Sequence, residues 1–277
     1  MPSTALSTAS STASGTAPAL EVENLTVKFP IRGGVLGKVK NYFTAVDGVS
    51  FTLPQGKILS IVGESGCGKS TLVKSLVGLV QADFGSYKLL GEKIDFKDGA
   101  SVRKVRNLVQ MIFQDPFSSL NPRQTVGEIL TAPVVARGVG FDAAQERARK
   151  LLDRVSIPVG AMEKFPHEFS GGQRQRLCIA RSLMVEPKVL LCDEVTSALD
   201  VSVQAQILHL LDDLRNELGI SLLFISHDMQ VVRALSDDVM VMYFGKVVER
   251  GEADKVLVNP QHEYTQKLLA SVPTIKR

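Results

Sequence analysis

The sequence predicts an α/β fold built around a mainly parallel sheet. Short apolar runs rich in β-branched residues alternate with segments whose apolar residues recur at helical spacing. A glycine-rich loop, GESGCGKS, lies directly between one such run and a helical pattern. Strands that alternate with helices imply a parallel sheet covered on both faces, with ligands at the carboxyl ends of the strands.

The N-terminal part begins with a segment that we do not expect to fold. Residues 1–19 are almost entirely Ser, Thr, Ala and Gly, so they bury too little apolar surface to offset chain entropy and should form a disordered tail. From Leu20 onward, alternation predicts strands at LEVENLTVKF, FTAVDGVSFTL and KILSIVG. The glycine-rich basic segment IRGGVLGKVKN should interrupt the first two.

The rest of the chain continues the alternation around a helical insertion. After the glycine-rich loop come a helix, a strand pair around SYKLLGEKI and a strand at LVQMIFQ. Residues 115–175 are predicted to be helical. The sheet should resume with the strands VLLCD, SLLFIS, DVMVMYF and KVVERG, with one helix between the first and second of these strands and another between the second and third. We therefore expect one domain over residues 20–250 and a C-terminal extension over 251–277.

Composition excludes several classes of protein. A chain of 277 residues with 44% hydrophobic residues can bury a large core. The charge of +3 comes from 32 basic and 29 acidic residues spread along the chain, which does not favour nucleic acid as a partner. There is no apolar run of the ~18 residues that span a bilayer and no signal peptide, so we expect a cytosolic protein. The three isolated cysteines should be reduced thiols.

The loop GESGCGKS fits a phosphate-binding loop. Its glycines let successive backbone amides point inward at a helix N-terminus, Lys69 adds a cation, and the Ser70 hydroxyl can bind Mg²⁺. The alternative is a Gly-rich turn with an exposed lysine, but the preceding strand and following helix favour nucleotide binding. The candidate residues are Gly63, Glu64, Ser65, Gly66, Cys67, Gly68, Lys69, Ser70 and Thr71.

Two carboxylates follow the buried-type strand VLLCD. Asp193 is placed to hold Mg²⁺, and Glu194 is placed to accept a proton from an attacking water. An isolated Asp-Glu pair would more often cap a turn. In a chain with a complete phosphate loop, the functional interpretation is preferred.

The stretch FSGGQRQRLCIARSL predicts a helix whose N-terminus could bind a second phosphate. Its first residues are Ser170, Gly171, Gly172 and Gln173. One γ-phosphate does not need two sites in one chain, so we expect this one to serve the nucleotide of another subunit. A plain Ser cap explains the start of the helix but not the repeated glycine.

In these motifs the chain resembles the ATP-binding subunits of ABC transporters. GESGCGKS resembles the Walker A loop, Gln114 the Q-loop, FSGGQ the signature, VLLCDE the Walker B strand, SALD the D-loop and His227 the switch histidine. Phe169 and Val195 depart from the usual residues, but both are apolar. The resemblance implies a P-loop NTPase of the ABC type, with an antiparallel β subdomain and a helical insertion, that binds ATP and Mg²⁺.

The resemblance also implies roles for single residues. Gln114 would contact Mg²⁺ and water, His227 the γ-phosphate, and Asp200 the opposite subunit, with Lys69 and Glu194 in catalysis. Each residue also has an ordinary alternative. Gln114 could simply be a polar residue at a strand end, His227 a buried histidine with its hydrogen bonds satisfied, and Asp200 a negative charge at a helix N-terminus. For the aromatic residue that stacks on adenine we prefer Tyr42, with Phe43 and Phe29 as alternatives.

Three further segments are similar to the oligopeptide, dipeptide and nickel importer branch. They are QDPFSSLNPRQTVGEIL, TSALDVSVQAQIL and the ending GKVVERG followed by NPQHEYTQKLLASVP. The branch implies a second ATPase subunit, identical or different, two membrane permeases and an external solute-binding protein, with this chain at the cytoplasmic face of a bacterial inner membrane. No cysteine follows Cys192, so we expect no iron-sulfur cluster.

Two rival classes fit the sequence less well. A soluble ABC-type ATPase acting on ribosomes or DNA would usually carry two cassettes or a coiled-coil arm, and this sequence predicts one cassette without such an arm. A P-loop kinase or GTPase leaves the FSGGQ segment unexplained.

Overall fold

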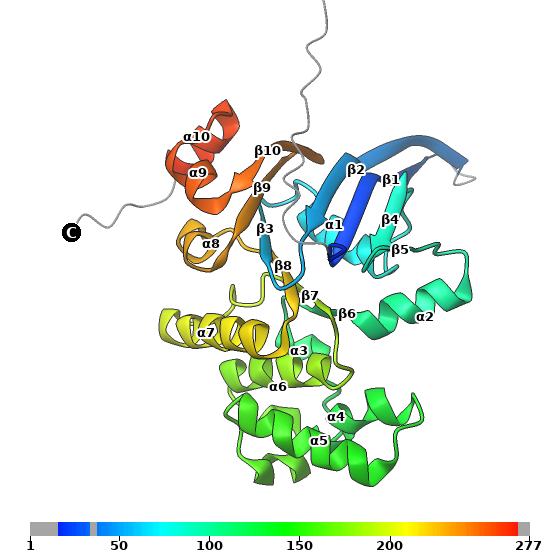
Figure 1. Cartoon of the computed structure of the whole chain (residues 1–277), viewed down its shortest axis with the longest axis vertical. Coiled ribbons are helices and arrows are strands. Elements are labelled where there is room, and N and C mark those ends of the chain that lie inside the picture. Colours follow the sequence, from blue (N-terminus) through cyan, green and yellow to red (C-terminus); the bar gives the residue numbers. More distant parts are fainter. Residues whose placement is uncertain (1–15, 34–37, 271–277) are drawn as a thin grey trace, which may run out of the picture.

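The computed structural model describes residues 16–33 and 38–270. A six-stranded sheet forms the centre, a four-stranded antiparallel sheet lies beside it, and a helical region lies at the other end of the molecule (Figure 1). The predicted α/β class, the antiparallel β subdomain and the helical insertion are confirmed.

The central sheet has the order β10-β9-β3-β8-β7-β6. Its strands are β3 (Ile58–Val62), β6 (Val109–Ile112), β7 (Val189–Asp193), β8 (Ser221–Ile225), β9 (Asp238–Tyr243) and β10 (Lys246–Glu252). All neighbours are parallel except β9 and β10. Every residue of β3, β7 and β8 is buried, which explains their continuous apolar sequences, because strands of a parallel sheet are covered on both faces.

Three helices follow the strands that carry the predicted motifs: α1 (Lys69–Leu76) after β3, α7 (Val201–Leu218) after β7 and α8 (Met229–Leu235) after β8. Two more, α9 (Ala253–Val258) and α10 (Glu263–Ala270), follow β10. The helices after β3, β7 and β8 therefore start at one edge of the sheet, where the parallel strands end. This edge brings together segments that are distant in the sequence.

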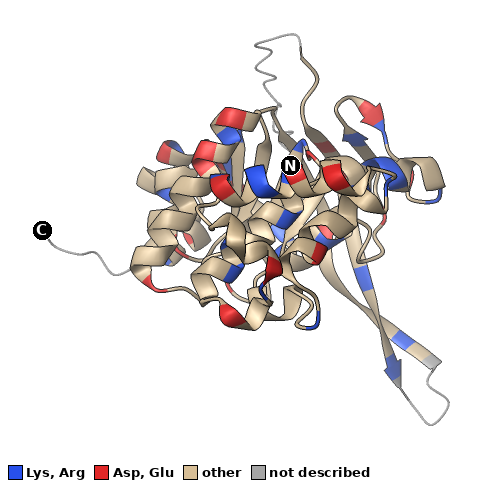
Figure 2. Ribbon diagram, turned by 90° about the horizontal axis from the view of Figure 1, so that it is seen from below, with Lys and Arg blue, Asp and Glu red and all other residues tan. Residues whose placement is uncertain are grey.

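The antiparallel sheet has the order β2-β1-β4-β5, formed by β1 (Leu20–Gly33), β2 (Lys38–Leu53), β4 (Ser86–Leu89) and β5 (Glu92–Lys93). The expected interruption by IRGGVLGKVKN is wrong at its two ends, because Ile31 pairs with Asn41 and Arg32 with Val39. Cross-strand pairing therefore continues into this segment, and residues 34–37 lie outside the described part. Figure 2 shows the β1–β2 hairpin extending away from the body with only Lys and Arg coloured along its outer part.

The helical insertion lies between β6 and β7. Its helices are α3 (Pro116–Ser119), α4 (Val126–Val135), α5 (Phe141–Arg154) and α6 (Gly171–Leu183), with short 3-10 turns at Val159–Glu163 and Pro166–Glu168. The helix α2 (Gly99–Leu108) was not predicted, nor were α9 and α10 of the C-terminal extension. Only Val105 of α2 is buried, so an apolar stripe is lacking, but Asp98 caps the helix by accepting hydrogen bonds from the amides of Ala100 and Ser101.

The ends of the chain partly join the folded body. Residues 1–15 of the predicted tail and residues 271–277 lie outside the described part. Within the described part of the tail, Ala19 is buried and the Ala17 carbonyl accepts a hydrogen bond of 2.7 Å from Gln55 Nε2, so the ordered body begins before Leu20. In the C-terminal extension, α9 and α10 pack on β9 and α8. No helix in residues 16–33 and 38–270 has the length and apolar character needed to cross a membrane.

Candidate nucleotide site

The glycine-rich loop connects β3 to α1 and needs its glycines for two reasons. Gly63 has φ 147° and Gly68 has φ 108°, values that L side chains rarely adopt. A Cβ on Gly63 would lie 2.2 Å from the Met242 carbonyl oxygen, and one on Gly68 would lie 2.3 Å from that of Ala45. The loop is therefore held tightly between β9 and β2 at its two ends.

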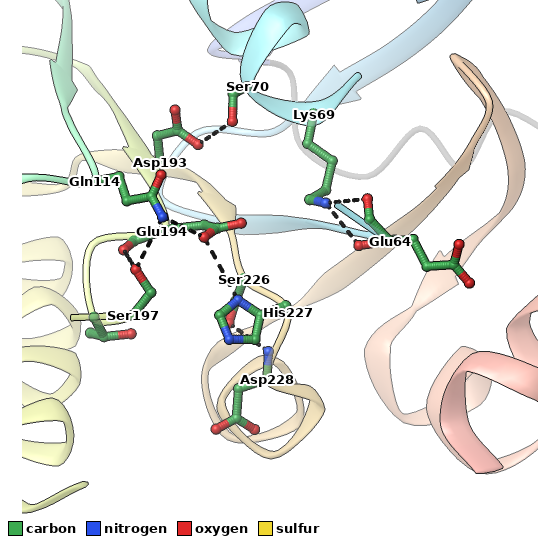
Figure 3. Close-up of polar contacts among 12 residues, drawn as sticks. Glu64, Lys69, Ser70, Gln114, Asp193, Glu194, Ser197, Ser226, His227 and Asp228 are labelled. Atoms are coloured by element: carbon green, nitrogen blue, oxygen red, sulfur yellow. Dashed lines mark hydrogen bonds and ion pairs between the residues drawn. The ribbon is translucent and has the colours of Figure 1, made fainter. Parts of the chain in front are cut away.

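Lys69 points back into this loop. Its Nζ atom donates hydrogen bonds of 2.8 Å to the carbonyl oxygens of Gly63 and Glu64 (Figure 3). It also lies 3.8 Å from Cys67 Sγ. Only 5% of Lys69 is exposed. Its two hydrogen-bond partners are neutral backbone carbonyls, which the oxygens of an anion bound in the loop could replace.

Ser70 and Asp193 bring the loop to the end of β7. Ser70 Oγ donates a hydrogen bond of 2.8 Å to Asp193 Oδ1 (Figure 3). Burial raises the pKa of the Asp193 carboxyl above its ordinary value, and the Ser70 hydroxyl opposes this increase only in part. A buried carboxylate beside a hydroxyl is a pair of hard oxygen donors that a divalent cation would stabilise.

Glu194 is the residue on which the polar side chains of this edge converge. Its backbone has φ 48°, an uncommon value for a residue other than glycine, and its amide donates to the Ile225 carbonyl at 3.1 Å. Its Oε2 atom accepts a hydrogen bond of 2.9 Å from Gln114 Nε2 and lies 3.7 Å from His227 Nδ1 (Figure 3). The ends of β6, β7 and β8 thus deliver three predicted site residues to one point.

A small polar cavity of about 90 Å³ adjoins Glu194. Ser197, Ser226 and His227 are among the residues that line it. Ser197, which belongs to the SALD segment, donates to the Glu194 carbonyl at 2.9 Å and lies 3.5 Å from Gln114 Nε2. The cavity is polar and large enough for water, so a nucleophilic water could lie beside the carboxylate.

The predicted second phosphate site is the N-terminus of α6. Ser170 Oγ accepts a hydrogen bond of 3.3 Å from the Gln173 amide, and Gln173 Oε1 accepts one of 3.0 Å from the Ser170 amide, so the two form a capping box. A Cβ on Gly172 would lie 2.4 Å from Val203 Cγ1 of α7. Helix packing therefore accounts for Gly172, whereas a Cβ on Gly171 would meet Leu199 Cδ2 only at an ordinary contact distance of 3.7 Å.

Two other predicted residues are less informative. Asp200 caps α7 by accepting a hydrogen bond of 3.0 Å from the Val203 amide, which is the ordinary alternative for this residue. Tyr42 is 57% exposed on the β1–β2 hairpin. Phe29 and Phe43 pair directly across that hairpin, so they share one face of it and Tyr42 lies on the other. Their contact with adenine stays a prediction.

The protein supplies only part of the oxygen ligands that Mg²⁺ needs, so phosphate oxygens and water would have to supply the rest. Ser70 Oγ and Asp193 Oδ1 are adjacent, and the Gln114 oxygen remains available because its amide nitrogen makes the contact with Glu194. No cluster of three or more His, Cys, Asp or Glu residues able to hold a metal occurs in the part of the chain that the structure describes. Since Mg²⁺ usually combines one or two protein ligands with phosphate oxygens and water, this partial set is what a nucleotide-bound Mg²⁺ needs.

Sequence reasoning missed one residue at the loop. Tyr264 of α10 accepts a hydrogen bond of 3.0 Å at its hydroxyl from the Glu64 amide. The two residues are 200 positions apart, and no local pattern in the sequence predicts their contact.

Comparison with known proteins defines the class. The family profile described as ABC transporter matches residues 46–197, which include the phosphate loop, Gln114, the FSGGQ segment and the Asp193–Glu194 pair. The chain belongs to the ABC transporter family. The resemblance to this family and the predicted fold class are thereby confirmed.

Curated relatives are more specific. The chain is 49% identical over 257 residues to the glutathione import ATP-binding protein GsiA of Salmonella choleraesuis (strain SC-B67) and 49% identical over 258 residues to that of Escherichia coli (strain K12). Each match covers 92% of this chain and 41% of the relative, so the chain spans about two fifths of the length of these proteins.

Solved structures support the same fold. The cbiO1 protein of Clostridium perfringens, described as part of the ABC transporter complex cbiONQ, matches with a TM-score of 0.75 and 29% identity over 93% of this chain and 96% of its own. The ATP-binding cassette MJ0796, in a dimeric post-hydrolysis state bound to ADP and Pi, matches with a TM-score of 0.74 and 26% identity over 84% of this chain and 98% of its own.

Proposed function

We propose that this protein is the ATP-binding and ATP-hydrolysing subunit of a bacterial ABC importer. The observation that carries the proposal is the convergence of the loop lysine, the Ser70–Asp193 pair and the Glu194–Gln114–His227 group at one edge of the central sheet (Figure 3). These parts supply a phosphate cradle, a cation site and a proton acceptor, which are the groups that phosphoryl transfer to water requires.

Binding relies on the loop and its lysine. The amides at the N-terminus of α1 and the ammonium of Lys69 attract the β- and γ-phosphates of ATP. Lys69 needs only to exchange the neutral carbonyls of Gly63 and Glu64 for phosphate oxygens, and it loses no ion pair in doing so. Ser70 and Asp193 would hold Mg²⁺, which would neutralise phosphate charge.

Glu194 acts as the general base in hydrolysis. Its carboxylate accepts a proton from the attacking water, while Gln114 and His227 on the same oxygen keep the carboxylate oriented. The side chain is only 16% exposed, which limits competition from bulk water. His227 also lines the cavity where the water would lie, so it can orient the water as well.

A second subunit completes the site. In Figure 1, α6 with its Ser170 cap belongs to the helical region and lies apart from α1. The α6 N-terminus therefore contacts the γ-phosphate held by the loop of another ATPase subunit, identical or different, and Asp200 lies at the same interface. The dimeric ADP- and Pi-bound MJ0796 structure supports a dimer as the working unit.

The curated relatives favour import over other work by an ABC ATPase. Both are named as glutathione import proteins, and glutathione is a tripeptide, which agrees with the peptide-importer branch that the sequence motifs indicate. Two permeases and an external solute-binding protein would complete the transporter, with this chain at the cytoplasmic face of the inner membrane. An ATPase that works on ribosomes or DNA has no such support.

The test is phosphate release by the purified chain with Mg²⁺ and ATP, alone and with a second ATPase subunit encoded beside it. Lys69→Ala should lose both ATP binding and phosphate release, because it removes the cation at the phosphates. Lys97→Ala, at an exposed lysine between β5 and α2, is the matched control and should behave as the wild type. Unchanged ATP affinity in Lys69→Ala would overturn the proposal.

A further inference from the structure

The hydroxyl of Tyr264 joins the C-terminal extension to the phosphate loop. The Glu64 amide donates to Tyr264 Oη at 3.0 Å, while the carbonyl of the same residue accepts from Lys69 Nζ at 2.8 Å. Glu64 is thus held from both sides, by α10 at its amide and by the loop lysine at its carbonyl. A rotation of the Glu64 backbone would disturb both contacts together.

The position of Tyr264 is fixed by the start of α10. Glu249 of β10 accepts hydrogen bonds at its carboxylate from the amides of Gln261, at 2.7 Å, and His262, at 3.1 Å. The Tyr264 amide in turn donates to His262 Nδ1 at 3.1 Å. These bonds anchor α10 to the central sheet immediately before Tyr264, so the hydroxyl is presented from a rigid support.

The ring of Tyr264 is packed against the strand beside the loop. It is 8% exposed and belongs to the buried cluster that includes Val62, the last residue of β3. Its centroid lies 4.1 Å from that of Tyr243 on β9. Since β9 also presents the Met242 carbonyl to Gly63, the backbone of the first two loop residues lies against β9 and α10.

We propose that Tyr264 is a positioning residue for nucleotide binding, through which the α9–α10 segment sets the affinity of the phosphate loop. This inference rests on the proposed function of that loop. The hydroxyl fixes the peptide group between Gly63 and Glu64, whose Gly63 carbonyl accepts a hydrogen bond from Lys69 Nζ, so the loop loses less conformational freedom when it binds phosphates. Displacement of α10, for example by a protein bound to it, would lower nucleotide affinity without contact with the nucleotide.

Tyr264→Phe removes the hydroxyl and keeps the ring. Loss of one neutral hydrogen bond corresponds to about a three- to tenfold change in an equilibrium constant. We expect ADP and Mg-ATP to bind about three- to tenfold more weakly and KM for ATP to rise by the same factor. The kcat should stay within about twofold, because Tyr264 contacts neither Glu194 nor the residues around it.

Tyr243→Phe is the matched control. This residue carries the neighbouring ring, and its hydroxyl makes no hydrogen bond to any residue that the structure describes. It should leave nucleotide affinity unchanged. Exchange of the Glu64 amide hydrogen with solvent should become faster in Tyr264→Phe only, and a general loss of stability would not produce that local change.

The experiment is calorimetric titration of the full chain with ADP and Mg²⁺, together with ATP kinetics and amide exchange. Wild-type affinity in Tyr264→Phe, an equal loss in Tyr243→Phe, or a fall in kcat at constant KM would each overturn the inference. Lys69→Ala separates the two proposals. If it binds ADP as the wild type does, the proposed function of the loop fails. If Lys69→Ala loses ADP binding and Tyr264→Phe binds ADP as tightly as the wild type, only the proposed role of Tyr264 fails.

Discussion

Replacing Glu194 with Gln separates binding from chemistry at this site. The glutamine keeps the length of the side chain and retains an oxygen that can accept the 2.9 Å hydrogen bond from Gln114 Nε2. It cannot accept a proton from water. The ATP site, formed by the loop and Asp193, is left intact, and we expect ATP affinity within a few-fold of the wild type.

The size of the effect follows from the role of a general base. Loss of such a group typically lowers a rate by about 10² to 10⁴. At about 1.4 kcal/mol for each factor of ten, this is roughly 3 to 5 kcal/mol of activation free energy. Since hydrolysis removes the γ-phosphate that joins the two subunits, the variant should also accumulate as a dimer with Mg-ATP and stay monomeric with ADP.

The assay combines phosphate release with light scattering, for the variant alone and with a second ATPase subunit. Glu217→Gln is a suitable control, because Glu217 is exposed on α7 and makes no ion pair with any residue of the described part. Turnover by Glu194→Gln above about a tenth of the wild-type rate would refute the reasoning, since even the weak end of general-base catalysis is about a hundredfold.

Two further substitutions test the second phosphate site and the cation site. Ser170→Arg should leave ATP binding by the separate subunit nearly normal and block hydrolysis, whereas a joint loss of binding and thermal stability would reduce Ser170 to a helix cap. Asp193→Asn should raise the thermal midpoint without nucleotide and lower phosphate release. Because the pKa of Asp193 is raised, the folded state binds a proton at this carboxyl more readily than the unfolded state does. The stability of the wild type should therefore fall as the pH rises from the unfolded-state pKa through the folded-state pKa. Asp193→Asn should lack this dependence of stability on pH. An unchanged midpoint would contradict the burial argument.

The sequence predicted the elements and residues whose reason is local. Continuous apolar strands predicted β3, β7 and β8, and the residues after them, such as Lys69, Glu194 and His227, had to meet at one edge because parallel strands share the direction of their carboxyl ends. The Ser170 cap likewise followed from the residue type at a helix start. For these residues the structure confirms the placement, while their roles in catalysis stay predictions.

Features that depend on tertiary contacts could not be predicted. The hairpin continues into the basic segment because Arg32 and Val39 pair across it, although glycines nearby suggested a break. A glycine is needed at position 172 because Val203 of another helix leaves no room for a Cβ. The left-handed backbone conformation of Glu194 is not indicated by the residues next to it in the sequence. The contact of Tyr264 with Glu64 needs the whole C-terminal extension to fold back on β9. The helix α2, in contrast, had a local signal that was overlooked, its Asp98 cap.

A crystal structure of Glu194→Gln with Mg-ATP tests the central claim most directly. The account predicts the β- and γ-phosphates in the loop from Gly63 to Thr71, with Lys69 moved from its carbonyl partners to the phosphates and Mg²⁺ bound by Ser70. Ser170 of a second subunit should contact the γ-phosphate. Phosphates bound outside this loop, or Lys69 still held by the Gly63 and Glu64 carbonyls beside bound ATP, would contradict it.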